Sequence, residues 1–217
     1  MAAVSAQQVK ELREKTGAGM MDCKSALSET SGDMDKAIEF LRKKGLKKVE
    51  KRAGKVAAEG SIVSYIHGGG RIGVVLELNC ETDFVGKGDD FLELGREIAM
   101  HIAWSNPRFV SPDEITEAEL DKEKEVLRAQ LKPEQEKMAD KIIEGKISKF
   151  YTDVCLLEQL DAKDPSAKKT IGDIINDYSV KVGEKITVRR FSRFEVGEGI
   201  EKEEVDYAAE VAQAAQV

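Results

Sequence analysis

Four consecutive residues, Thr82, Asp83, Phe84 and Val85, carry the clearest candidate chemistry in this 217-residue sequence. They stand between a strand-like pattern and a glycine-flanked loop, and neither neighbour obviously needs a phenylalanine beside an acid. In one interpretation, Phe84 is ordinary core under a hairpin, and Thr82 or Asp83 caps a turn. In the other, Phe84 is an exposed aromatic anchor with an adjacent carboxylate, presented to a partner protein. The residues alone leave both interpretations open.

The pair Met20 and Met21 raises a similar question, because it follows the turn-like segment Thr-Gly-Ala-Gly at residues 16–19. Two glycines in four residues supply turn freedom and little helix propensity. Adjacent methionines cannot both face one core. We therefore expect one of them to remain available for an adaptable contact.

Other residues give little support to catalysis or metal binding. Cys23, Cys80 and Cys155 form no CxxC pair, and two histidines are too few for a zinc cluster. Cys23 is predicted to be a small packing residue, and His101 a surface or interface residue on the helix face away from its apolar stripe. No GxSxG, HExxH, Walker or dinucleotide motif is present. The sequence therefore predicts a protein that is not an enzyme and holds no cofactor.

Composition excludes further classes. The sequence has 34 Lys plus Arg against 41 Asp plus Glu, a net charge of −7, which weakens any prediction that the whole protein binds nucleic acid. No apolar run approaches the roughly 18 residues that a membrane span needs. Charged residues within residues 1–15 occupy the place of a signal peptide's apolar stretch. We expect a cytoplasmic protein without membrane contact.

Three short helical patterns must position the methionine pair. Ser5 is expected to cap the first helix, whose apolar face carries Leu12, and Asp22 is placed to cap the second. The third pattern ends near Gly45. These patterns predict a small three-helix domain over residues 1–45.

A basic linker is predicted over residues 46–59. It belongs to a stretch, residues 42–55, with eight Lys or Arg and a single acid, Glu50. A solvated linker or a helix extension is favoured over a nucleic-acid contact, since no aromatic residues interleave with the charges. An acidic protein partner would suit the same charges.

An α+β core with a small antiparallel sheet is predicted over residues 60–196. Residues 61–67 and 71–80 flank a Gly-Gly-Gly turn, and the second of them alternates between a mostly apolar and a more polar face, which predicts a β-hairpin. Residues 186–196 return to strand character and could join as a third strand. This order of elements is typical of the α+β class.

Helices are expected between these strands. One begins near Asp89 and ends at Asn106, and Thr116 with Glu119 forms a capping box for another. Pro133 suits the first position of a segment that ends near Gly145. A further helix begins at Thr170 with Asp173 and ends at Gly183. A C-terminal helical module is predicted over residues 197–217, with an amphipathic helix at 205–211.

Four segments then resemble a known family. ELREKTGAGMMDCKSAL (11–27), NCETDFVGK (79–87), EIAMHIAWSNPRFV (97–110) and RFEVGEGIEKEEVDYAAEVA (193–212) are similar to elongation factor Ts. That family is the guanine-nucleotide exchange factor of the translation GTPase EF-Tu. The resemblance covers almost the whole chain. It implies a ubiquitin-associated-like (UBA-like) N-terminal domain, a basic linker, a dimerisation-type core and a C-terminal helical module.

One departure from the family pattern concerns the core. Long-form members repeat the hairpin-and-helix unit, whereas here the Thr-Asp-Phe-Val loop leads almost directly into the helix at 97–110. The chain thus resembles a short-form member. Some short forms act as homodimers, so the resemblance implies a possible homodimer.

The resemblance also implies roles for individual residues. Thr82, Asp83, Phe84 and Val85 would displace Mg²⁺ from EF-Tu, with Phe84 as an apolar wedge between helices and Asp83 disturbing the contacts that hold Mg²⁺. Thr82 and Val85 would fix the shape of the loop. Leu12, Arg13, Met20 and Met21 would dock on the nucleotide domain of EF-Tu, and residues 193–212 would add a contact. No direct contact with nucleic acid is implied.

Two alternatives belong to other classes of function. An RNA-binding module acting through residues 42–55 predicts a steep salt dependence of binding. A ubiquitin-like-binding adaptor predicts that residues 1–45 bind alone and that the loop at 82–85 is dispensable. Neither accounts for the resemblance after residue 60.

Overall fold

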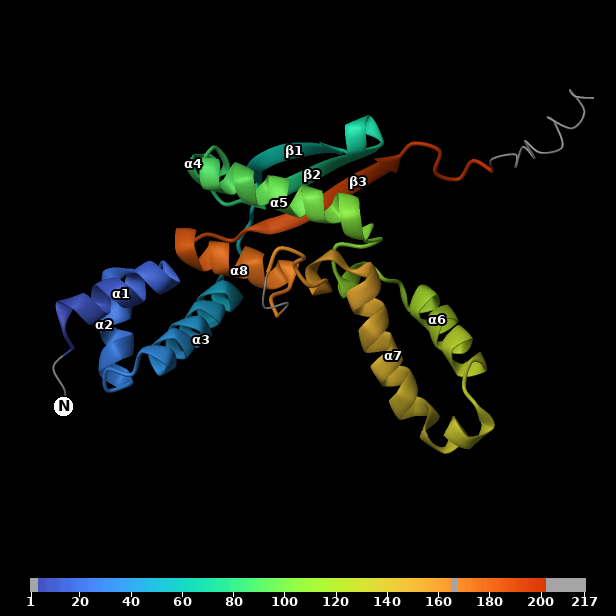
Figure 1. Cartoon of the computed structure of the whole chain (residues 1–217), viewed down its shortest axis with the longest axis horizontal. Helices are drawn as coiled ribbons and strands as arrows, with labels where there is room; N and C mark the ends of the chain where they lie inside the picture. The colour runs from blue at the N-terminus through green and yellow to red at the C-terminus, as the bar shows by residue number, and fades with distance from the viewer. Residues whose placement is uncertain (1–3, 165–167, 202–217) are drawn as a thin grey trace, which may run out of the picture.

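Three helices form the N-terminal unit of the computed structural model, which describes residues 4–164 and 168–201 (Figure 1). They are α1 (Ala6–Thr16), α2 (Met20–Glu29) and α3 (Met34–Arg52). The predicted cap of the first helix is confirmed, because the Ser5 hydroxyl accepts a hydrogen bond from the backbone N–H of Gln8. Buried apolar side chains of all three helices form one small core: Val9, Leu12, Cys23, Ala26, Leu27, Ala37 and Leu41.

The second helix begins earlier than the sequence predicts. Asp22 is not its cap, since Gly19 holds that position and Asp22 lies in the first turn. The Asp22 carboxylate instead accepts hydrogen bonds from the Nζ atoms of Lys44 and Lys48, at 3.0 and 2.9 Å. The bonds from Lys48 and Lys44 lower the pKa of Asp22. They also tie α2 to α3.

The third helix does not end near Gly45 but continues to Arg52. Gly45 is buried against Val180 of α8 (Ile171–Val182), and a Cβ atom at Gly45 would lie only 2.9 Å from a Val180 methyl group. The missing side chain lets the two helices approach. Their packing supports the helix through a residue of low helix propensity. Residues 46–52, expected in the linker, are therefore helical.

One antiparallel sheet lies in the core, with its strands in the order β1 (Glu59–His67), β2 (Ile72–Cys80) and β3 (Thr187–Glu195). The predicted hairpin and third strand are both confirmed. A 3₁₀ turn at Gly68–Gly70 joins β1 to β2, and all three glycines there have positive φ angles. A small sheet beside mostly helical structure confirms the predicted α+β class.

Two helices complete the main core. α5 (Asp89–Ser105) packs across β1 and β2 (Figure 1), and α8 adds residues to the same buried cluster. The predicted limits of both helices are confirmed by Asn106 and Gly183 in left-handed conformations and by the capping box of Thr170 with Asp173. The buried leucine, isoleucine and phenylalanine side chains of this cluster are Leu76, Leu78, Phe91, Leu94, Ile98, Ile102, Leu156, Ile171, Ile175 and Ile186.

A helical hairpin projects from this core (Figure 1). It consists of α6 (Glu117–Ala129), a 3₁₀ helix (Pro133–Met138) and α7 (Ala139–Val154), flanked by short 3₁₀ turns at Pro112–Glu114 and Leu156–Glu158. The capping box of Thr116 with Glu119 is confirmed. The expected helix end near Gly145 is wrong. Burial of Ile143 and Ile147 outweighs the roughly 1 kcal/mol that glycine costs inside a helix.

The amphipathic helix expected at 205–211 lies outside the described residues. Of the predicted C-terminal module, residues 197–201 are described and form an exposed turn after β3. Within 4–164 and 168–201, no helix combines the length and apolar character needed to cross a membrane.

Candidate functional site

Phe84 is one of the most exposed large apolar side chains, with 85% of its surface accessible. It lies on a single helical turn, α4 (Asp83–Gly86), that follows β2 directly. Thr82 caps this turn, and its hydroxyl oxygen accepts a hydrogen bond from the backbone N–H of Val85. Val85 is partly buried against the main core. The structure therefore decides between the two interpretations: Phe84 is displayed to solvent rather than packed under the hairpin.

The neighbouring Asp83 is also exposed, and its carboxylate accepts a hydrogen bond from Nζ of Lys87 at 2.6 Å. This hydrogen bond lowers the pKa of Asp83 below its ordinary value, so the carboxylate is ionised at neutral pH. The loop thus presents an aromatic ring and a negative charge side by side.

The far end of the loop is held by close backbone packing. Gly86 is buried, and a Cβ atom there would lie 3.1 Å from Cα of Gly60 and 3.2 Å from Sγ of Cys80. The Ser61 hydroxyl donates a hydrogen bond to the carbonyl oxygen of Gly86 at 2.8 Å. Only glycine fits this contact without displacing a neighbour. The loop therefore returns to the sheet immediately after Phe84.

The second group of predicted site residues lies on the N-terminal unit. Met20 and Met21 open α2 and are 59% and 77% exposed, so both methionines are available, not one. Arg13 is exposed in the last turn of α1. Leu12, in contrast, is fully buried in the three-helix core. Leu12 therefore belongs to the core of the N-terminal unit and does not contribute to this exposed surface directly.

The structure places these two groups on different units and does not join them into one pocket. The loop residues Thr82 to Val85 are contiguous on α4, and the methionines are on α2. In Figure 1, α4 and the N-terminal unit lie toward the same end of the molecule's long axis.

The interpretation of His101 as a surface residue is wrong. His101 is buried on α5, with its Nε2 atom 3.0 Å from Oε1 of Gln159. Burial lowers its pKa and keeps the ring neutral at pH 7. The error arises because Gln159, far along the chain, covers a helix face that looks solvent-exposed in sequence. The prediction for Cys23 is confirmed, since this thiol is fully buried.

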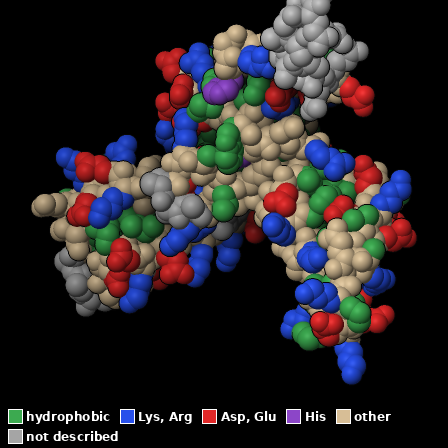
Figure 2. Space-filling model, turned by 45° about the vertical axis from the view of Figure 1, so that its right-hand side comes forward, with side chains coloured by type: hydrophobic (Ala, Val, Ile, Leu, Met, Phe, Trp, Pro, Cys, Tyr) green, Lys and Arg blue, Asp and Glu red, His purple; other side chains and the backbone are tan. Residues whose placement is uncertain are grey.

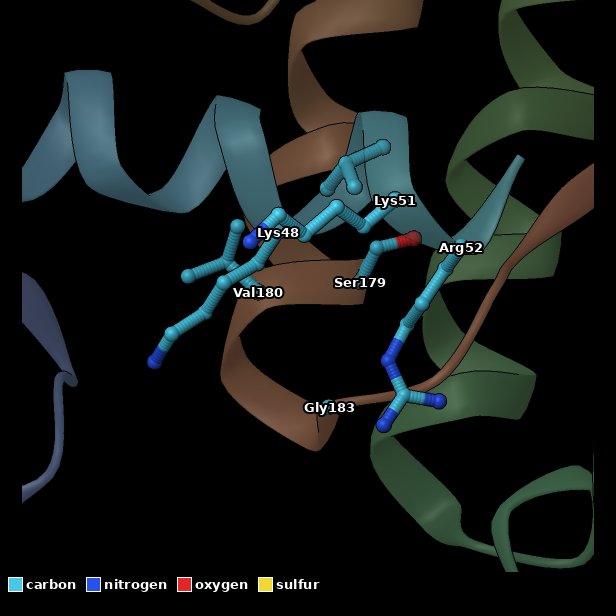
Figure 3. A pocket seen from close by; sticks show the side chains of 7 residues that line it. Lys48, Lys51, Arg52, Ser179, Val180 and Gly183 are labelled. Atoms are coloured by element: carbon cyan, nitrogen blue, oxygen red, sulfur yellow. The ribbon is translucent and has the colours of Figure 1, made fainter.

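The basic stretch at residues 42–55 makes many of its contacts within the chain. Arg42 pairs with Asp173, Arg52 pairs with Glu81, and two lysines pair with Asp22 as described above. Figure 3 shows Lys48, Lys51 and Arg52 beside α8, around a pocket of about 340 Å³. On the face in Figure 2, acidic and basic side chains are interspersed. The ion pairs of Arg42, Lys44, Lys48 and Arg52 join α3 to α2, to α8 and to the segment after β2.

Metal ligation does not explain the exposed loop. Among the residues that the structure describes, no three His, Cys, Asp or Glu side chains gather in a way that could hold a metal ion. The fold and its exposed residues define a class of protein. It is an α+β chain with a three-helix N-terminal unit, and it displays apolar side chains at the start of α2 (Met20 and Met21) and on α4 (Phe84).

Comparison with known proteins identifies the family. The family model described as "Elongation factor TS" matches residues 2–198. Proteins named Elongation factor Ts are similar over nearly the full length of both chains. The chain is 59% identical over 213 residues to that of Desulfitobacterium hafniense (97% of each chain) and 58% identical over 214 residues to that of Desulforamulus reducens (98% of each). It is 51% identical over 214 residues to that of Geobacter sulfurreducens (98% of each). The chain belongs to the elongation factor Ts family of translation elongation factors.

Proposed function

We propose that this chain is a guanine-nucleotide exchange factor that binds GDP-bound EF-Tu and promotes GDP release, after which GTP binds. The observation that carries this proposal is the exposed Phe84 on a held loop, beside an ionised Asp83, in a chain of this family. Exchange makes and breaks no covalent bond. The proposal therefore requires neither a catalytic residue nor a cofactor in this chain.

The thermodynamic requirement is differential binding. The factor must bind nucleotide-free EF-Tu more tightly than the GDP form, and by reciprocity GDP then weakens binding of the factor by the same ratio. Each tenfold change in affinity corresponds to about 1.4 kcal/mol of coupling. Rapid release requires an affinity difference of several powers of ten between the two forms of EF-Tu.

The exposed loop provides a physical source for this coupling. GDP is held largely through Mg²⁺ and through backbone N–H groups that surround its phosphates. Phe84 would act as an apolar wedge that shifts a helix of EF-Tu near this site. Asp83 would bring a negative charge toward the phosphates and weaken the contacts that hold Mg²⁺. A displacement of a few groups is enough to loosen the nucleotide.

Docking would come from the N-terminal unit. Met20 and Met21 offer flexible apolar surface, and Arg13 adds an exposed positive charge on α1. These side chains would contact the nucleotide domain of EF-Tu. Residues 193–212, of which 193–201 are described, would add a further contact.

The test is release of a fluorescent GDP analogue from EF-Tu, followed by stopped flow. A saturable acceleration by the wild-type protein is expected. Absence of acceleration by folded protein would contradict the proposal and favour an RNA-binding or ubiquitin-like-binding module. No contact among residues 4–164 and 168–201 favours either alternative, and the ion pairs at Arg42, Lys44, Lys48 and Arg52 leave fewer charges for RNA.

We also propose that two copies of the chain associate through the outer face of the sheet. Ile62, Ile66, Val75 and Phe194 are exposed there, on the side opposite α5, and Ile66, Gly73 and Phe194 lie in one cross-strand row. Exposed apolar side chains that share one face of a sheet mark a candidate interaction surface. A pair between Glu77 and Arg190 at 2.7 Å supplies a polar border to the patch.

Sedimentation tests this association. The wild type is expected to sediment as a dimer, and Ile66→Glu as a monomer, because the new charge would be buried without a partner. Met138→Glu places the same charge on an exposed apolar residue of the helical hairpin and is expected to remain dimeric. A monomeric wild type at tens of micromolar, or an Ile66→Glu protein that stays dimeric, would refute the sheet-face dimer.

A further inference from the structure

Resting on the proposed function, we infer that Glu184 is a positioning residue that holds the exposed loop in the orientation that presents Phe84. Glu184 follows the end of α8 and is only partly exposed. One carboxylate oxygen accepts hydrogen bonds from the backbone N–H groups of Glu81, at 3.1 Å, and Thr82, at 3.0 Å. The other oxygen accepts from the Thr82 hydroxyl at 2.6 Å. One side chain thus binds three donors at the entry to the loop.

These hydrogen bonds are of the strong kind, because the acceptor carries a charge. They also act on the residue that controls the turn. The Thr82 hydroxyl caps α4 by accepting from Val85, and its own hydrogen is directed to Glu184. Removing the carboxylate would free this hydroxyl to rotate and would leave two backbone N–H groups without their acceptor.

A second carboxylate completes a reciprocal arrangement. Glu81 accepts hydrogen bonds from the backbone N–H of Lys185 at 2.7 Å and from Nη1 of Arg52 at 2.8 Å. The Lys185 N–H and Arg52 lower the pKa of Glu81, whose side chain is only 17% exposed. Glu184 therefore binds the backbone N–H of Glu81, and Glu81 binds the backbone N–H of Lys185, the residue after Glu184. The segment after α8 and the entry to the loop are joined in both directions.

Arg52 extends this arrangement to the N-terminal unit. It is the last residue of α3, and Figure 3 shows its guanidinium reaching away from that helix past the end of α8. The Lys185 ammonium donates to the carbonyl oxygens of Ala53 and Lys55, at 2.6 and 3.1 Å. The segment that follows α3 is thus fixed beside the loop. Docking through Met20 and Met21 would then bring Phe84 to a defined place on the partner.

The loop needs this external support because it is very short. α4 has four residues, and a single helical turn does not form on its own, since nucleation fixes several dihedral angles for one hydrogen bond. Packing at Gly86 holds its far end, as described above. Glu184 holds the near end of the loop through its hydrogen bonds to Thr82, which is two residues before Phe84. An exposed ring cannot be positioned by contacts of its own, so its orientation depends on these two anchors.

The test compares Glu184→Ala and Glu184→Gln with the wild type in GDP release from EF-Tu across factor concentrations. For Glu184→Ala we expect a maximal rate about tenfold lower, or about 1.4 kcal/mol, with a half-saturating concentration within about threefold of the wild type. The docking methionines are unchanged in this variant. Glu184→Gln should recover most of the rate, because its amide oxygen can accept the two N–H bonds and its NH₂ group can donate to Thr82.

A purely structural role gives a different pattern. If Glu184 only supported folding, a fraction of the molecules would be inactive. The half-saturating concentration would then rise, while the maximal rate would equal that of the wild type, and this result would overturn the proposal. Glu144→Ala, which removes an exposed acid on α7, is the matched control and is expected to behave as wild type. If Glu184→Ala does not fold, Glu184→Asp is used, whose shorter side chain should give an intermediate loss of maximal rate.

Amide hydrogen exchange separates this proposal from the proposed function. The amides of Glu81 and Thr82 should exchange faster in Glu184→Ala than in the wild type, whereas core amides of α5 should not change. Unchanged exchange at Glu81 and Thr82 would refute the positioning role even in an active factor. If the wild type fails to accelerate GDP release, the nucleotide-exchange function is refuted. Faster amide hydrogen exchange at Glu81 and Thr82 in Glu184→Ala would still establish that Glu184 holds the loop.

Discussion

Replacing Phe84 with alanine is expected to lower the maximal rate of GDP release from EF-Tu by about 30-fold, because truncating a central aromatic anchor typically costs about 2 kcal/mol or more. The ring is 85% exposed in the free protein, so its removal leaves the folded core intact. The free energy of unfolding should stay within about 0.5 kcal/mol of the wild type, as for other surface substitutions. Stopped-flow release and denaturant unfolding measure the two quantities.

Two comparisons sharpen this prediction. Phe84→Leu keeps an apolar side chain of smaller size and should lose less of the maximal rate than Phe84→Ala. Met138→Ala removes exposed apolar surface from the helical hairpin and should change neither quantity. A Phe84→Ala protein that unfolds at lower denaturant, while its folded molecules release GDP at the wild-type rate, would contradict the wedge.

The second large effect is expected from the methionine pair. In the double variant Met20→Ala, Met21→Ala, the half-saturating concentration should rise about 30-fold, since each side chain is expected to contribute at least about 1 kcal/mol when buried by a partner. The maximal rate should remain that of the wild type, because the Phe84 loop is unchanged. Titration of the factor at fixed EF-Tu separates the two parameters.

Met138→Ala is again the matched control, as it truncates an exposed methionine on another unit. The docking role would be refuted if the double variant reached half-saturation at the wild-type concentration. It would also be refuted if only the maximal rate fell, since that result would place the methionines beside the nucleotide rather than in the docking surface.

Local patterns in the sequence predicted much of the fold. The alternation at 71–80 sets which side chains of β2 face the core, and a one-residue shift would reverse them all. Ser5, Thr116 and Thr170 cap helices through bonds that span only three residues. Such features depend on neighbours in the chain, so the sequence alone is sufficient to find them.

The errors involve partners far away in the sequence. Helix α3 passes through Gly45 because Val180 packs there, and His101 is buried because Gln159 covers it. Asp22 is drawn from the capping position that was predicted for it into ion pairs with two lysines of α3. None of these contacts leaves a periodic pattern that a reader of the sequence can recognise.

The candidate site was predictable from the sequence only where its residues form an unusual local pattern. Phe84 and the methionines stand out because they break local rules, but only the structure shows that all three are exposed. Glu184 was missed entirely. It is a single acid after a helix-ending glycine, and its role depends on hydrogen bonds to residues about a hundred positions earlier.

The most direct test of the central claim is GDP release from EF-Tu with the wild-type factor at saturating and at very low free Mg²⁺. If the loop acts by disturbing the Mg²⁺ and phosphate site, the acceleration should be large when Mg²⁺ is present. It should shrink markedly when the metal has already been removed, because that part of the GDP contact is then already lost. An acceleration of the same size at both Mg²⁺ levels, or none at either, would contradict the account.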